Sequence, residues 1–127
     1  MLEAVARAPD FTWDLELEMT NVFELLGEIR RRPSLYLDAD EEHRFVQLRC
    51  LEHMLRGYAL ALSVHGIEEP VGDFNRGFIA YLREVKGWGA EFGWVNAIQR
   101  AVGGDEEKMW DWSWKLIDEY RESLRNV

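Results

Sequence analysis

Three consecutive arginines followed by a proline stand out in this acidic chain. They are Arg30, Arg31 and Arg32, and Pro33 comes directly after them. A basic cluster of this kind can bind an anion, contact a nucleic acid or complete the last turn of a helix. Proline disfavours helical geometry in the residue before it, and cations near a helix C-terminus offset the negative end of the helix dipole. We therefore predict that the arginines end a helix and have a structural role.

Two residue pairs have a spacing that puts both side chains on one helix face, as metal ligands on a helix require. They are Cys50 with His53 and Asp40 with His43. A closed zinc site takes four ligands, and the chain has one cysteine and no HExxH motif. We therefore expect no metal site and no cofactor, and we interpret Cys50 as a buried thiol beside a partly exposed imidazole.

The residue pattern does not indicate catalytic machinery. A nucleophilic cysteine or serine needs a general base close by. The three histidines are not spaced to converge, and none of the four serines lies in a GxSxG motif. The glycine-rich stretch GWGAEFG lacks the lysine and the preceding strand of a phosphate-binding loop. We predict that the protein is not an enzyme and has no catalytic residue.

The net charge of −9, from 24 acidic and 15 basic residues, limits the class of partner. A nucleic-acid-binding protein must neutralise phosphates with a basic surface, so we expect no nucleic-acid partner. Opposite net charge speeds association, so a basic protein partner suits this chain. Two acidic runs either meet such a partner or complement the dipoles of helix N-termini. They contain Asp38, Asp40, Glu41 and Glu42 in the first run and residues 105–107 in the second.

The stretch MWDWSWK places three tryptophans at alternate positions of a predicted helix. Trp110 and Trp114 are four residues apart and share the core face, whereas Trp112 points roughly the opposite way, next to Asp111. Tryptophan is enriched at interaction surfaces. Trp112 and Asp111 are therefore candidates for partner binding, and the alternative is that Trp112 packs against the N-terminal segment or a neighbouring helix.

Cap residues and apolar spacing divide residues 21–127 into about five helices. The segment from Ser34 to Leu37 is predicted to be extended, with Leu35 and either Leu37 or Tyr36 turned inward. The first predicted helix is capped by Thr20 or Asn21 and stopped by Pro33, and the second is capped by Asp38 or Asp40 and runs to about His65 before Gly66. The third is capped by Asp73 and has an apolar side made of Phe74, Phe78, Tyr81, Leu82 and Val85. A short helix in WVNAIQRAV ends at Gly103 and Gly104, and the last helix is capped by Asp105 and has an apolar face that reaches Leu124.

Residues 1–20 follow a different pattern. From Phe11 to Met19, apolar and polar side chains alternate strictly, as they do in a strand. Leu15, Met19 and the apolar residues after them also fall on one helical face, so a helix stays open as an alternative. A lone strand needs a partner for its hydrogen-bonding groups. As a strand or extended arm, the segment would pair with its own copy in a homodimer through residues 11–19, or with a foreign sheet edge.

The length and composition indicate one domain in a reducing compartment. A chain of 127 residues is typical of a single domain and can hold a core without disulfides. Cys50 is the single cysteine, which fits the cytoplasm. The N-terminus has no secretory pattern, and the longest nearly uncharged run, GYALALSVHGI, is too short to span a membrane. We expect a cytoplasmic protein with no membrane association.

Four stretches of the chain form a recognisable pattern: IRRRPSLYL, LEHMLRGYALAL, FNRGFIAYLREVKGWGAEFGWVNAI and DEEKMWDWSWKLIDEYRE. Together they resemble a group of small, all-helical bacterial proteins, most of them uncharacterised, whose pattern is approximately RxRPxMYLG, then FxxGYxxAL, then a final acidic helix ending LLDEY. The resemblance extends over residues 22–122. It departs at Leu35, where methionine is usual, and at Asp38, where glycine is usual.

The resemblance implies a role as well as a fold. Some proteins of this kind look like members of toxin–immunity neighbourhoods, which implies a small acidic immunity protein with a basic toxin as its partner. The motif residues are interpreted as structural, and they are Arg30, Arg32, Pro33, Tyr36 and Tyr58. One alternative is a small-ligand-binding protein or enzyme with a pocket near Arg30, Arg32, Tyr36 and Tyr58, and another is a regulatory homodimer.

The sequence as a whole predicts an all-α fold. We expect a single compact bundle of about five helices over residues 21–127, with residues 1–20 as an N-terminal strand or extended arm. The expected function is that of a non-catalytic protein-binding module of the immunity type, which neutralises a bacterial toxin.

Overall fold

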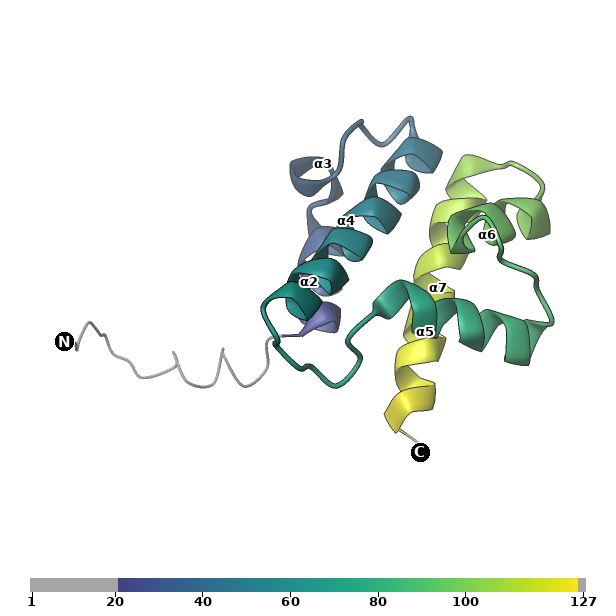
Figure 1. The fold of residues 1–127 in the computed structure, drawn as a ribbon. Helices are drawn as coiled ribbons and strands as arrows, with labels where there is room; N and C mark the ends of the chain where they lie inside the picture. The colour runs from purple at the N-terminus through teal and green to yellow at the C-terminus, as the bar shows by residue number, and fades with distance from the viewer. Residues whose placement is uncertain (1–20, 126–127) are drawn as a thin grey trace.

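Seven helical segments make up residues 21–125, the part of the chain that the computed structural model describes (Figure 1). No strand occurs among these residues, so the predicted all-α fold is confirmed. The strand or arm predicted at residues 11–19 lies outside the described residues. In chain order the segments are α2 (Val22–Arg31), α3 (Pro33–Tyr36), α4 (Arg44–Val64), α5 (Phe74–Tyr81), the π-helix η1 (Leu82–Lys86), α6 (Trp94–Val102) and α7 (Glu106–Arg125).

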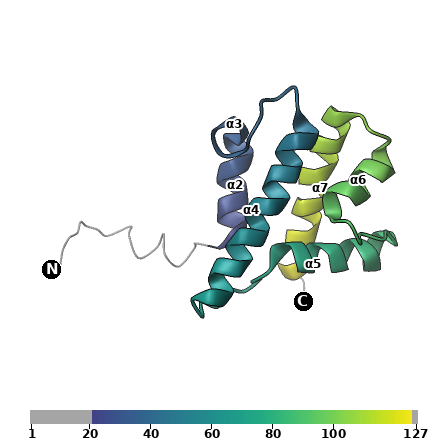
Figure 2. The same cartoon turned by 45° about the horizontal axis from the view of Figure 1, so that its top comes forward.

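The two longest helices, α4 and α7, pack against each other at the centre and run in the same direction (Figure 1 and Figure 2). Helices α2 and α3 lie on one side of this pair, and α5 and α6 lie on the other. Because α4 and α7 run the same way, their N-terminal ends lie at the same end of the molecule. Helix α2 runs opposite to α4, so the N-terminal end of α2 lies near the C-terminal end of α4.

Aromatic side chains fill the centre of the core. Phe74, Phe78 and Trp94 are at most 1% exposed, and their ring centroids are 5.2 to 6.5 Å apart in tilted and edge-to-face arrangements. Tyr120 of α7 lies 5.6 Å from both phenylalanine rings. Such arrangements add to the stabilisation from burial. A Cβ atom at Gly77 would collide with the Tyr120 hydroxyl group, so a glycine lets α5 lie this close to α7.

The predicted caps and glycine stops are largely confirmed. Asn21, Asp73 and Asp105 each accept a hydrogen bond from a backbone N–H of the helix that follows, at 2.8, 3.2 and 3.1 Å. Each bond satisfies a donor that has no partner within the helix. Gly66 and Gly103 follow α4 and α6 with φ values of 64° and 83°, the left-handed geometry that glycine adopts without strain.

The segment after Pro33 differs from the prediction. It is not extended but forms the short helix α3, because proline suits the first turn of a helix, where its missing N–H has no partner to lose. Pro33 therefore ends α2 and also begins α3. Leu37 is buried, but Leu35 is 66% exposed and Tyr36 lies at the surface, so the predicted inward position of Leu35 is wrong.

The start of α4 also differs from the prediction. Neither Asp38 nor Asp40 caps this helix, which begins at Arg44 with His43 as a cap residue that makes no side-chain capping bond. A carboxylate of α7, on Glu106, instead accepts a hydrogen bond from the first turn of α4. The cap comes from tertiary structure, which a local sequence pattern does not reveal.

Two helices have a shorter apolar face than predicted. Val85 is 57% exposed and Leu124 is 42% exposed. Helix α5 passes into the π-helix η1 at Leu82, and a π-helix has more residues per turn than an α-helix. This change of pitch turns Val85 away from the face that Phe78 and Leu82 bury. Leu124 lies in the last turn of α7, beyond the final buried residue Tyr120.

Candidate partner-binding surface

Two acidic segments that are far apart in the chain meet at one end of the molecule. One is the loop between α3 and α4, and the other is the beginning of α7. They come together because α4 and α7 pack side by side in the same direction. We call this surface the acidic edge, and its eight exposed residues are Asp38, Asp40, Glu41, Glu42, Asp105, Glu106, Glu107 and Asp111.

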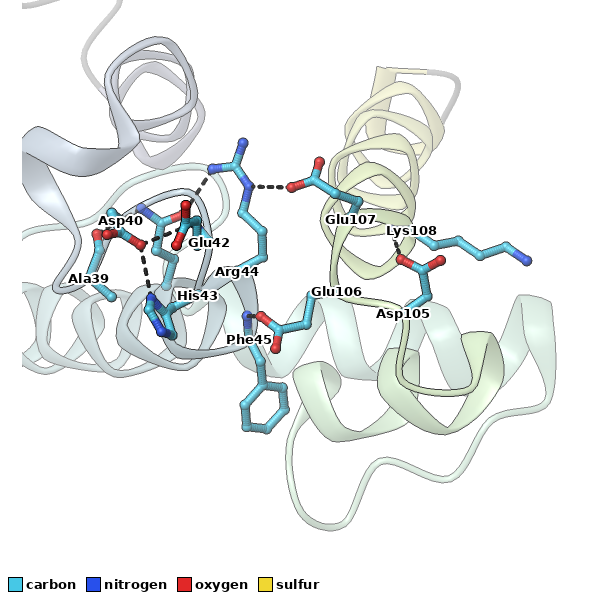
Figure 3. A network of polar contacts seen from close by, with 11 residues as sticks. Ala39, Asp40, Glu42, His43, Arg44, Phe45, Asp105, Glu106, Glu107 and Lys108 are labelled. Carbon is cyan, nitrogen blue, oxygen red and sulfur yellow. Dashed lines mark hydrogen bonds and ion pairs between the residues drawn. The ribbon is translucent and has the colours of Figure 1, made fainter.

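Two contacts from the first turn of α4 join the halves of the acidic edge (Figure 3). The backbone N–H of Phe45 donates a hydrogen bond to Glu106 Oε1 at 3.0 Å. Arg44 Nε donates to Glu107 Oε2 at 3.3 Å. The first contact satisfies an amide that the cap residue of α4 leaves without a side-chain acceptor. The packing of α4 against α7 therefore builds the edge.

The Arg44 side chain is held inside this contact. Its guanidinium group lies 4.0 Å from the centroid of the Trp110 ring, and its Nη1 donates a hydrogen bond to Gln47 Oε1 at 2.9 Å. The side chain is only 13% exposed. A cation over an aromatic face is attracted by the ring electrons. Arg44 therefore stabilises the fold, and its positive charge offsets the negative charge of Glu107.

The buried Gln47 side chain fixes the conformation of the acidic loop. Its Nε2 donates a hydrogen bond to the Ala39 carbonyl at 3.0 Å, and the residue is 0% exposed. Ala39 has a φ of 92°, in the left-handed region that residues other than glycine rarely adopt. Such a conformation persists where surrounding contacts hold it, and it is concentrated at functional sites.

Asp40 and His43 form a polar pair within the loop (Figure 3). Asp40 Oδ1 accepts a hydrogen bond from the backbone N–H of Glu42 at 3.0 Å and lies 2.9 Å from His43 Nδ1. The hydrogen bond with His43 lowers the pKa of Asp40, and the same bond raises the pKa of His43. Asp40 therefore stays ionised to lower pH, and His43 gains its positive charge at a higher pH than an isolated histidine.

The helix dipole accounts for only part of the acidic edge. Residues 105–107 form the cap and first turn of α7, where negative charge is stabilised. The first turn of α4 contains no acidic residue, because the helix begins after the loop. Asp38, Glu41 and Glu42 therefore precede α4 and do not lie in its first turn, where the dipole acts most strongly.

The two other predicted partner-binding residues differ in accessibility. Asp111 is exposed, whereas Trp112 is half-buried and packs against the core. The Lys115 ammonium group lies 5.0 Å from the centroid of the Trp112 ring. Trp110 and Trp114 are 8% and 3% exposed, in line with the core positions predicted for them. Asp111 belongs to the acidic edge, and packing accounts for much of the Trp112 surface.

The arginine triplet completes the end of α2, as predicted. Arg30 Nη1 lies 3.0 Å from Asp118 Oδ2, and its guanidinium group lies 5.3 Å from the centroid of the Trp114 ring. Arg31 pairs with Glu28 on the preceding turn of the same helix. The contacts of Arg30 join α2 to α7, and the positive charges of the arginines offset the dipole of α2.

The structure separates the residues of the alternative ligand pocket. Tyr36 Oη donates a hydrogen bond to Glu28 Oε2 at 2.9 Å, and this bond is the largest cause of the lowered pKa of Glu28. Arg32 Nε lies 4.0 Å from the same carboxylate. Tyr58 lies in the second half of α4, where its hydroxyl group donates to Glu69 at 2.7 Å, and burial together with this bond raises the pKa of Tyr58 to about 12. Tyr58 therefore belongs to a different part of the molecule from Arg32 and Tyr36.

Glu52 of α4 is a buried carboxylate that the sequence pattern did not single out. It is 5% exposed, and its Oε2 accepts a hydrogen bond from the backbone N–H of Val95 in the first turn of α6 at 3.2 Å. Burial raises the pKa of Glu52. Gly93 has a φ of 102°, and a Cβ atom there would collide with the Glu52 carboxylate. The only sequence signal is an acidic residue beside the apolar stripe of a predicted helix.

The residues considered as metal ligands do not belong to a group of described side chains that could bind a metal ion. Cys50 is half-buried and accepts a weak hydrogen bond from the backbone N–H of Asp38 at 3.4 Å. His53 is exposed. Within residues 21–125, no group of three or more His, Cys, Asp or Glu side chains is arranged to hold a metal ion.

Comparison with known proteins gives no relative for this chain. No protein-family model matches it, and no curated protein or solved structure does so. The resemblance to bacterial proteins of the immunity type therefore stays a prediction. Among the described helices, none is both long and apolar enough to cross a membrane.

Proposed function

We propose that the protein is a non-catalytic binding module that captures a basic protein partner through the acidic edge. The observation that carries this proposal is the loop of residues 38–42. Its carboxylates are exposed, they lie outside the first turn of α4, and they continue the negative surface at the start of α7. The dipole of α4 does not require charge at these positions. Such a surface attracts a positively charged partner and accelerates encounter with it.

The acidic edge is ordered by contacts within the protein. Gln47 holds the loop through the Ala39 carbonyl, and the contacts of Phe45 with Glu106 and of Arg44 with Glu107 fix the loop end against α7. A surface that is ordered before binding loses less conformational entropy on association. The edge therefore suits a partner with a rigid surface of complementary charge.

Neutralisation of a toxin fits these properties. The chain is small and has a net charge of −9, and its sequence resembles small all-helical bacterial proteins, some of which look like immunity proteins. An immunity protein that covers a toxin needs a complementary surface and no catalytic group. We therefore propose a basic bacterial toxin as the partner.

The test removes three charges from the loop in the full chain. The variant combines Asp38→Asn, Glu41→Gln and Glu42→Gln, and affinity capture from a lysate of the native host is followed by mass spectrometry. We expect the wild-type chain to capture a basic protein and the triple variant to lose it, because the variant removes charge and leaves the helices intact.

A matched control removes the same charge elsewhere. Glu24, Glu84 and Glu122 are exposed and lie outside the acidic edge, and their triple replacement by glutamine changes the net charge equally. We expect this control to capture the same basic protein as the wild type. Equal losses for both triple variants would show that net charge alone matters, and capture that both retain would show that the loop does not bind.

A further inference from the structure

The last turns of α4 are apolar on almost every side. The sequence from Ala59 to Val64 is ALALSV. A helix with apolar side chains all round is normally covered on all sides. Yet Leu60 is 63% exposed and Val64 is 71% exposed, and Ile67 in the turn that follows is 54% exposed. Among residues 21–125, nothing covers this face of α4.

The three exposed side chains form one stripe beside a groove. Leu60 and Val64 are four residues apart and share one face of α4, and Ile67, just beyond the end of the helix, lines the same groove as Leu60. Between α4 and the loop of residues 67–73, the surface is hollowed into a groove of about 590 Å³, to which Leu60, Ile67 and Arg56 contribute. Gly57, one turn before Leu60, has open space where a Cβ atom would lie. Another segment of backbone can therefore approach this face closely.

The described chain begins at this same end of α4. Both views show the N-terminal end of α2 beside the C-terminal end of α4 (Figure 1 and Figure 2). Twenty residues precede Asn21. An extended chain covers roughly 3.3 Å per residue, so residues 11–19 can reach the whole C-terminal half of α4.

We infer that residues 11–19 of the same chain lie over the exposed face of α4, with their apolar side chains against Leu60, Val64 and Ile67. An extended segment presents alternate side chains on one face, and here that face is wholly apolar. Contact between the two apolar faces removes both from water. The apolar side chains of the segment are Phe11, Trp13, Leu15, Leu17 and Met19.

The segment of the same chain is the favoured occupant because it is tethered. A short tether gives an effective concentration in the millimolar range, far above that of a second copy in dilute solution. The exposed face lies at the C-terminal end of α4, and the acidic edge lies at its N-terminal end. The inference is therefore independent of the proposed binding of a basic partner.

A spin label in the full chain tests the inference. The label is attached at Glu16→Cys, on the polar side of the alternation, in a Cys50→Ser background that leaves one reactive thiol. Methyl NMR then measures paramagnetic broadening across the molecule. We expect strong broadening of the methyl signals of Leu60, Val64 and Ile67.

Exposed methyl groups elsewhere are the control. Leu35 and Val85 are 66% and 57% exposed and belong to α3 and η1, which lie away from the C-terminal end of α4, so their signals should keep their intensity. A mixture of spin-labelled chains and isotope-labelled chains without the spin label should show no broadening. Intact signals at positions 60, 64 and 67, equal broadening at the controls, or broadening in the mixture would each overturn the inference, and the last would assign the face to a second copy.

Substitutions in the face give a second test. Leu60→Asp together with Val64→Asp should abolish the broadening at Ile67, because the charges make burial of this face unfavourable. Both positions are exposed, so the helical core should stay folded. Val46→Asp, at a 46% exposed position near the other end of α4, is the matched control and should leave the broadening unchanged. Broadening at Ile67 that survives the double substitution would overturn the inference.

Discussion

Two carboxylates, Glu52 and Glu106, make the same contact in different surroundings. Each accepts a hydrogen bond from the backbone N–H of the second residue of a helix to which it does not belong. Glu52 does so for Val95 in α6 at 3.2 Å, and Glu106 does so for Phe45 in α4 at 3.0 Å. Glu52 is 5% exposed, whereas Glu106 lies in the exposed acidic edge.

This difference in burial separates acids that stabilise the fold from acids that face a partner. Water can replace Glu106 as an acceptor for the Phe45 amide, so the loss of this carboxylate leaves no donor unsatisfied. Water has little access to the Val95 amide, so removal of the Glu52 carboxylate would leave this buried donor without an acceptor. We therefore expect stability to depend on Glu52 and partner binding to depend on the acidic edge.

The largest effect is expected at the helix start that Glu52 caps. Trp94 is the first residue of α6, is 0% exposed, and donates a hydrogen bond from Nε1 to Asn75 at 2.8 Å. Trp94→Ala should lower the free energy of unfolding by about 3–5 kcal/mol, because it leaves a large cavity. Urea unfolding measures this loss. The half-buried Trp112 is the control, and an equal loss for Trp112→Ala would contradict the division between the core and the edge.

Removal of the two carboxylates tests the comparison itself. Glu52→Ala should lower the free energy of unfolding by about 1–3 kcal/mol, because the Val95 amide loses its acceptor inside the protein. Glu106→Ala should lower it by only about 0.5 kcal/mol, the low end for the loss of a helix cap, because water can replace the carboxylate as acceptor. Chemical denaturation of both variants provides the measurement. If Glu106→Ala proves as costly as Glu52→Ala, burial does not separate the roles of the two residues.

The protonation of Glu52 predicts a dependence of stability on pH. Burial raises its pKa from the ordinary value of 4.5. A carboxyl group with a raised pKa stabilises the folded state fully below its unfolded pKa, and this contribution is lost as the pH rises through the folded pKa. We expect the stability of the wild type relative to Glu52→Gln to fall as the pH rises above 4.5. A difference that is constant with pH would show that Glu52 titrates normally.

The smallest effect is expected in the arginine triplet. The Arg31 side chain is 67% exposed and pairs with Glu28 on its own helix. Exposed pairs of this kind contribute little to stability, so Arg31→Ala should change the free energy of unfolding by less than about 0.5 kcal/mol and leave partner capture intact. Loss of capture at an unchanged melting temperature would move the binding surface from the acidic edge to the triplet.

Local signals in the sequence predict much of this fold. The caps at Asn21, Asp73 and Asp105 and the glycine after α6 lie next to the helices that they delimit, so a short window of sequence contains the whole interaction. The start of α4 depends on Glu106, which is distant in sequence, and so it was predicted too early. Predictions therefore fail where a tertiary contact sets the boundary of a helix.

The sequence predicts which acidic residues form the candidate site but not that they lie on one surface. The acidic runs are apparent in the sequence, but their meeting on one surface depends on α4 and α7 running in the same direction. The roles of Gln47, Arg44 and Glu52 have no local signal, because each acts on a residue of another segment or helix. The position of the loop carboxylates before the first turn of α4 likewise follows from the tertiary contact that starts this helix.

The most direct test of the central claim is the rate at which the captured basic partner associates with the protein. Stopped-flow measurements at several salt concentrations compare the wild type with the loop variant and the control variant of equal charge. The loop variant should associate about tenfold more slowly at low salt and with a weaker salt dependence, because local charge steers the encounter. The control variant should stay close to the wild type. Identical rates and salt dependences for the two variants would contradict a binding role for the acidic edge.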